Sequence, residues 1–122
     1  MRYEAVHPVP IGDVESGTLD GMPDELSRSL IAIDLHEPDA ARAQALCVRL
    51  SHHPDEVVHG NALLALGHLA RRFGLLDEGS VRPAVEAGLT DASKFVCGQA
   101  DAAADDLGHF LGWRIRRPGG PA

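Results

Sequence analysis

Two segments of the chain repeat one another at a spacing of 38 residues. The stretch Val58–Ala62 (VHGNA) aligns with Val96–Ala100 (VCGQA), and Leu69 then aligns with Leu107. Both segments carry apolar residues at helical spacing, and each follows a shorter helical stretch and a turn that contains Pro or Asp. A helix pair that recurs in this way cannot bury its apolar face alone, so neighbouring pairs must stack. The repeat therefore predicts an all-α protein with one shared core.

The pattern between residues 24 and 113 divides into about five helices joined by short links. In the first, Leu26, Leu30, Ile33 and Ile31 are expected to face inward. The long third helix is expected to bury Val58, Ala62, Leu66, Leu69 and Phe73. Turn and capping residues are expected to bound the helices: Asp24, Asp39, Pro54 with Asp55, Gly74, Ser80 with Pro83, and Asp91 or Ser93.

The two ends of the sequence differ from this central part. Residues 1–23 contain four prolines or glycines before Gly21 and Pro23, so we expect an irregular arm, with a short extended piece over residues 3–6. Residues 114–122 are rich in Pro and Gly and are expected to form a flexible tail. At 122 residues the protein is expected to be a single domain, 1–122.

Composition restricts the class of function. The sequence has 18 acidic and 11 basic residues, a net charge of −7, which disfavours nucleic-acid binding because phosphate would be repelled. No apolar run is long enough to span a membrane, and because no apolar stretch follows the first residues we expect no secretory signal. The two cysteines do not form a disulfide framework. We therefore expect a cytoplasmic protein, a monomer rather than an oligomer.

The repeated segments resemble a known family. His53–Ala62 and Asp91–Ala100 are similar to HEAT repeats, in which a turn Asp precedes a Val-Arg pair. The resemblance covers roughly residues 39–112, with 24–36 as a first half-repeat. Gly60–Arg71 and Ala103–Trp113 also resemble small bacterial HEAT-repeat proteins, some of which accompany secreted toxins as immunity proteins. The resemblance implies a short HEAT-like α-solenoid, which the irregular N-terminal arm expected from the composition of residues 1–23 would precede.

The sequence departs from the HEAT pattern at one position. The family's Arg, which usually forms a ladder with turn aspartates, is replaced by His59 in one repeat and by Cys97 in the other. Packing of small residues is the expected substitute. Gly60 and Gly67 lie on one helix face, and each costs about 1 kcal/mol of helix propensity relative to Ala. We therefore expect a neighbouring helix to approach the backbone closely at these glycines.

Several side chains have the types needed for chemistry, but none forms a complete site in the sequence. Glu56 and His59 have the spacing of a di-iron motif, but the second copy that such a site needs is absent from the equivalent positions. Asp105 and His109 could bind zinc only with a further ligand. Asp106 is adjacent on the same helix, and the only obvious donor from another helix is His68, which the repeat places opposite Asp106. Cys47 falls on the apolar stripe, and Cys97 is expected to be half-buried. No cofactor, no metal and no catalytic residue is predicted.

A binding surface is the favoured interpretation. In solenoids the second helix of each pair lines the face that partners contact. The candidate partner-binding residues are Asn61, Leu64, His68, Arg71, Gln99, Asp101, Asp105, Asp106, His109 and Trp113. Trp113 has an alternative role as a lid over the last repeat, and the aspartates have one as a solvated face.

The predicted function is therefore a non-enzymatic protein-binding module. Its most concrete form is an immunity protein that neutralises a cognate bacterial toxin, since an acidic surface is complementary to the cationic groove of a nuclease. The partner would be another protein, such as a basic toxin domain. A general HEAT-repeat scaffold or regulatory protein, and a HEAT-fold metal-binding enzyme, are the alternatives.

Overall fold

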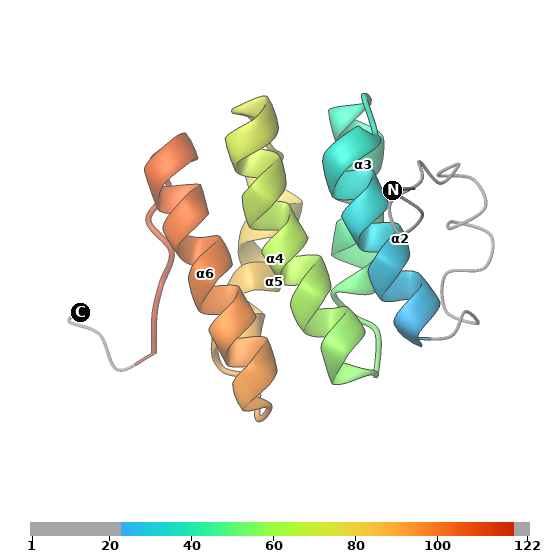
Figure 1. Ribbon diagram of the computed structural model, residues 1–122. Helices are drawn as coiled ribbons and strands as arrows, with labels where there is room; N and C mark the ends of the chain where they lie inside the picture. The colour runs from blue at the N-terminus through green and yellow to red at the C-terminus, as the bar shows by residue number, and fades with distance from the viewer. Residues whose placement is uncertain (1–22, 119–122) are drawn as a thin grey trace, which may run out of the picture.

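The computed structural model describes residues 23–118, which form five α-helices and no strand (Figure 1). The helices are α2 (Pro23–His36), α3 (Ala40–Leu50), α4 (Glu56–Phe73), α5 (Glu78–Leu89) and α6 (Lys94–Leu111). The predicted all-α class and number of helices are confirmed for this part of the protein. The predicted N-terminal arm, with its extended piece over residues 3–6, lies outside the described residues except for Pro23, which begins α2.

The helices form two layers. Figure 1 shows α2, α4 and α6 side by side in one layer, with α3 and α5 behind them, and the backbone reverses direction from each helix to the next. The central helix α4 packs against all four others. This position follows from its sequence, because α4 is apolar over most of its circumference and buries residues on several sides.

Local capping explains where most of the helices begin and end. The side chains of Asp39, Asp55 and Ser93 accept hydrogen bonds from backbone N–H groups in the first turns of α3, α4 and α6, as expected. Two expected starts were wrong. Asp77, not Ser80, caps α5, and Asp24 lies inside the first turn of α2. Both helices therefore begin earlier than the sequence pattern suggested.

Left-handed glycines end the two long helices. The expected Gly74 ends α4 with φ 70°, and Gly112 ends α6 with φ 71°. Glycine adopts this conformation without the steric cost that a Cβ would impose.

The core follows the predicted apolar stripes with two corrections. Ile31, expected to face inward, is 50% exposed, because Leu30 and Ala32 with Ile33 already fill the buried side of α2. Phe73, expected in the buried stripe of α4, is only partly buried and packs at the edge of the core. The fully buried large side chains are Leu30, Ile33, Leu46, Leu50, Val58, Leu63, Leu66, Leu69, Val81, Val85, Val96 and Leu107.

Small residues bring α6 close to α4, as the sequence predicted. A Cβ on Gly60 would lie 2.7 Å from Cε2 of Phe95, and a Cβ on Gly67 would lie 3.0 Å from Cα of Ala103. Gly88 on α5 likewise leaves room for the side chain of Leu63 on α4, and the sequence pattern did not indicate this contact. The helix propensity lost at these glycines is therefore exchanged for close helix packing.

Candidate functional site

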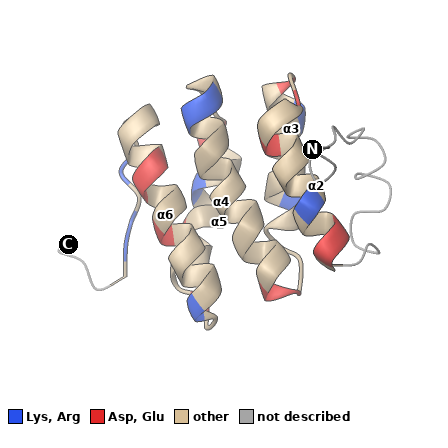
Figure 2. Ribbon diagram, in the orientation of Figure 1, with Lys and Arg blue, Asp and Glu red and all other residues tan. Residues whose placement is uncertain are grey.

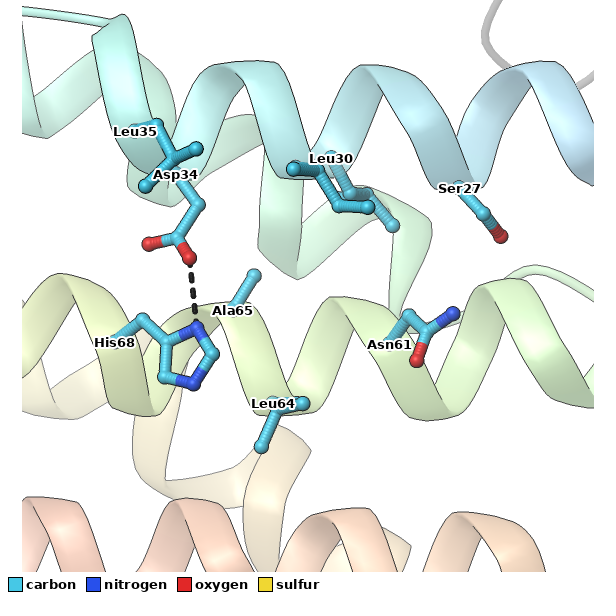
Figure 3. Close-up of a pocket in the computed structure, with 9 residues that line it drawn as sticks. Ser27, Leu30, Asp34, Leu35, Asn61, Leu64, Ala65 and His68 are labelled. Carbon is cyan, nitrogen blue, oxygen red and sulfur yellow. Dashed lines mark hydrogen bonds and ion pairs between the residues drawn. The ribbon is translucent and has the colours of Figure 1, made fainter. Parts of the chain in front are cut away.

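A groove of about 260 Å³ lies between α2 and α4 (Figure 3). Helix α2 contributes one wall and α4 the other, because the two helices run side by side in the same layer. The lining is mainly apolar. Its residues are Ser27, Leu30, Ile31, Asp34, Leu35, Asn61, Leu64, Ala65 and His68.

An ion pair joins the two walls at one end of the groove. Oδ2 of Asp34 lies 2.7 Å from Nδ1 of His68, and both side chains are largely buried, at 14% and 30% exposure. This hydrogen bond, opposed by burial and supported by the charges of Asp34 and Asp106, raises the pKa of His68 above its ordinary value, while Arg71 acts in the opposite sense. The imidazolium form of His68 is therefore favoured beside Asp34.

A second cation, the guanidinium of Arg72, also connects α4 to α2 at the same end of the groove. The guanidinium of Arg72 on α4 donates hydrogen bonds to the backbone carbonyls of Ile33, at 3.4 Å, and Asp34, at 3.0 Å. These carbonyls belong to the last turn of α2, where C=O groups lack partners within the helix. The carbonyl of Ile33 also accepts a hydrogen bond of 3.1 Å from the N–H of Glu37, just after the helix. Arg72 therefore caps α2 from the neighbouring helix, and it also lies over the ring of Phe73.

The other end of the groove carries uncharged polar groups. Ser27 and Asn61 face each other there across the two walls (Figure 3). The hydroxyl oxygen of Ser27 is buried and has no hydrogen-bond partner within residues 23–118. The amide oxygen of Asn61 accepts a hydrogen bond of 2.9 Å from the amide N–H of Gln99 on α6. This bond links residues 38 positions apart, at equivalent places in the two segments that repeat in the sequence.

The structure brings six of the ten predicted partner-binding residues onto one surface, here called the front face. The front face is the exposed side of the layer formed by α2, α4 and α6. Asn61, Leu64 and His68 line its groove, and Gln99 and Asp106 reach it from α6 against Asn61 and Gly67. Arg71 follows on α4, one turn beyond His68, and is exposed.

Exposed apolar side chains lie on the same face. Ile31 and Leu35 are 50% and 52% exposed at the groove, and Phe95 is 40% exposed where it covers Gly60. Helix α4 carries no charged residue from Val57 to Ala70 apart from its histidines, so Lys, Arg, Asp and Glu flank the centre of the layer without occupying it (Figure 2). Grouped apolar side chains of this kind, with a polar rim, mark protein interaction surfaces.

The remaining predicted residues lie elsewhere. Asp101 and Asp105 are on the outer flank of α6, where both contact the guanidinium of Arg117. His109 is exposed and packs its ring against Phe110. Trp113 is half-buried against the core, with the guanidinium of Arg82 5.9 Å from its ring centre. The contacts of Trp113 agree with its alternative role as a lid.

His59 and Cys97, which occupy equivalent positions 38 residues apart, have different partners. Nδ1 of His59 lies 3.9 Å from Oδ2 of Asp91, the turn aspartate before α6. The thiol of Cys97 donates instead to the backbone carbonyl of Asp91 at 2.9 Å. Cys97 is half-buried, as expected.

The cysteines and the suspected metal ligands form no recognisable reaction centre among the described residues. Complete burial, together with the charge of Asp34, raises the pKa of Cys47 to about 12, so its thiolate is not formed near neutral pH. Among residues 23–118, no three His, Cys, Asp or Glu side chains are grouped so that they could hold a metal ion. His68 pairs with Asp34 rather than joining Asp105 and His109. None of the described helices combines the length and apolarity that a membrane crossing requires.

Sequence reasoning missed the partner of His68. Asp34 lies one turn after Leu30 and directly after Ile33, so it stands at the border of the apolar stripe of α2. A carboxylate at such a border is half-buried when a second helix packs there, and it then needs a partner. That border position is the signal that could have drawn attention to Asp34.

Comparison of the protein with protein-family models, with curated proteins and with solved structures found no match.

Proposed function

We propose that this protein is a non-enzymatic binding module whose front face docks onto another protein. The observation that carries the proposal is the convergence of the groove residues Asn61, Leu64 and His68 with the half-exposed Ile31 and Leu35. Apolar anchors inside a polar border give a partner both buried area and orientation.

The net charge of the protein indicates the class of partner. The value of −7 favours association with a basic protein, since complementary potentials accelerate encounter and disfavour acidic competitors. The most concrete partner is a basic bacterial toxin domain that the protein neutralises in the cytoplasm as a monomer. Such a toxin uses a cationic groove to hold its nucleic-acid substrate, and an acidic cover would block that groove.

The two-layer arrangement supports the proposed HEAT-like α-solenoid. Helices α4 and α6 lie side by side at the 38-residue register, with the Asn61–Gln99 hydrogen bond between equivalent positions. The contact of His59 with Asp91 has the placement of a HEAT ladder pair, although at 3.9 Å it is weaker than an Arg–Asp bond. These contacts favour a HEAT relationship over an unrelated helical bundle.

The test uses the product of the gene immediately upstream, purified and measured against this protein by calorimetry at low and high salt. We expect tight binding that weakens as salt rises. Ile31→Asp with Leu35→Asp should weaken binding at least about tenfold, because a charge would be buried under the partner. The matched control is Leu75→Asp, which changes a more exposed leucine located beside α3.

A second variant tests the acidic contribution. Asp105→Lys with Asp106→Lys should keep the helical circular dichroism signal and abolish partner binding. Unchanged affinity in both the apolar and the acidic variants would place the interface away from the front face and from the adjoining flank of α6. Neighbouring genes that encode only metabolic enzymes would contradict the toxin partner.

A further inference from the structure

Residues 112–118, here called the C-terminal segment, lie against the flank of α5 and α6 in a non-helical conformation. In Figure 1 this segment leaves the end of α6 and runs back beside it. The sequence of this region predicted a flexible tail, but residues 113–117 make contacts with both helices. Residues 119–122 lie outside the described part.

Two charged side chains of α5 bind the backbone of the C-terminal segment. The guanidinium of Arg82 donates a hydrogen bond to the carbonyl of Arg114, and the carboxylate of Glu86 accepts one from the N–H of Arg116 at 3.0 Å. Arg82 and Glu86 are one helical turn apart and also pair with each other. Bonds to backbone carbonyl and N–H groups do not depend on the bound sequence, so this pair is suited to any extended peptide.

Alternate side chains of the segment turn toward the helices. Trp113 and Ile115 are half-buried against the core, and Arg117 reaches the carboxylates of Asp101 and Asp105, with 2.7 Å between Nη2 and Oδ1 of Asp105. Spacing by two is the period of an extended backbone. Asp101 and Asp105 are one turn apart on α6, so a single planar guanidinium can bridge both.

The segment is held mainly at the surface. The side chains of Asp101 and Asp105 are 58% and 71% exposed, and exposed ion pairs contribute little to stability. The segment keeps its place because its covalent attachment gives it a high effective concentration. A separate peptide with the same chemistry can therefore compete with it when its own contacts are more extensive.

We propose that the α5–α6 flank is a recognition site for an extended, arginine-bearing segment of a basic protein. The C-terminal segment occupies this site in cis, as an internal competitor, until the partner displaces it. The proposal rests on the proposed function, because it names the chemistry by which a basic partner engages the acidic side of α6. The partner's segment would present an apolar side chain and an arginine two residues later.

The test uses full-length protein and a synthetic peptide with the sequence of residues 112–118, in which phenylalanine replaces the tryptophan. Trp113 is the one tryptophan of the protein, so its emission reports on the C-terminal segment itself. Adding the peptide should move the emission of Trp113 to longer wavelength in a saturable way, because the displaced indole enters water. The same peptide with glutamate in place of the arginine that corresponds to Arg117 should have no effect.

Two variants separate the site from the segment that fills it. Arg117→Glu weakens the internal competitor and should bind the peptide about tenfold more tightly than the wild-type protein. The double variant Asp101→Asn with Asp105→Asn also releases the C-terminal segment, but it removes the carboxylates that bind the arginine. It should therefore bind the peptide about tenfold more weakly than Arg117→Glu does. Asp24→Asn with Glu25→Gln removes the same charge from α2, which does not contact α6 in the described structure, and should bind like the wild-type protein.

The proposal is overturned if the peptide binds neither the wild-type protein nor Arg117→Glu, in which case the segment is a fixed cap. Equal binding of the arginine and glutamate peptides would also overturn it. These measurements involve no toxin, so their failure is distinct from failure of the proposed function. A protein that binds the peptide as expected, yet does not bind the upstream gene product, would keep the arginine site and lose the toxin partner.

Discussion

Helix α4 has two neighbours in its layer, α2 and α6, and the two contacts differ although they use equivalent residues. The side chains that α6 directs at α4 correspond, at a spacing of 38 residues, to those that α4 directs at α2. The two sets are Asn61, Ala65 and His68 on α4 and Gln99, Ala103 and Asp106 on α6.

The difference lies in what each set meets. On α4, Gly60 and Gly67 leave room for α6 to approach to backbone contact. On α2, the side of the helix that lines the groove carries the larger Leu30 and Ile31, and a groove remains open there. A repeated set of side chains on one helix is therefore not enough to produce a repeated helix–helix contact. The size of the side chains on the opposing helix sets the distance between the two helices.

The polar contacts of α4 with its two neighbours also differ. Between α4 and α6, the amides of Asn61 and Gln99 form a neutral hydrogen bond. Between α4 and α2, the ion pair of Asp34 with His68 and the capping bonds of Arg72 join the helices beside the groove. The closely packed contact relies on shape, whereas the open contact relies on charge and leaves apolar surface available for a partner.

The largest expected effect comes from filling the close contact. Gly67→Leu should destabilise the protein by about 2–3 kcal/mol, because the new side chain overlaps Ala103 and Asp106 and forces α6 away. Urea unfolding followed by circular dichroism measures this. Gly98→Ala is the control, since no atom lies within 4 Å of its added Cβ, and it should stabilise by up to about 1 kcal/mol. Equal stability of Gly67→Leu and wild type would show that the helices are not in close contact.

Breaking the ion pair of the open contact should have the next largest effect. Asp34→Ala leaves His68 without its partner and is expected to cost about 1.5 kcal/mol in unfolding free energy. Asp34→Asn retains a hydrogen-bonding oxygen and should cost less. The same urea experiment distinguishes them, and a cost near zero for the alanine variant would mean that the groove does not depend on this pair.

The pH dependence of stability sharpens the contrast between the two contacts. The pKa of His68 is raised in the folded state above its ordinary value of 6.5, so the charged form is favoured by folding. The resulting stabilisation is fully present below pH 6.5 and is lost as pH rises through the folded-state pKa. The difference in unfolding free energy between wild type and Asp34→Asn should therefore shrink across that range. A constant difference would argue against a charged His68.

The smallest expected effect concerns the neutral bond between the repeats. Gln99→Ala removes the partner of Asn61 and should cost about 0.5 kcal/mol, because both amides are only partly buried and water can replace the bond. The cost should not vary with pH, in contrast to that of Asp34→Asn. A pH-dependent effect at Gln99 would indicate that the two contacts are electrostatically coupled.

Local sequence was sufficient to predict the helices, most of their caps and the close contact. Periodic apolar residues have no alternative burial in a protein of this size, and Asp39, Asp55 and Ser93 act within one turn of their own positions. Gly60 and Gly67 signalled close approach because they sacrifice helix propensity at one face. These properties depend on short spacings, which can be read directly from the order of residues.

The pairing of polar residues was settled by the packing of whole helices. Asp34 pairs with His68 across 34 residues, and Arg117 pairs with Asp101 and Asp105 after the backbone reverses direction, although no local pattern marks either pairing. The predicted partner-binding residues consequently divide between the front face and the flank of α6. Such pairings depend on the rotation and offset of each helix against its neighbours, which many distant side chains set together.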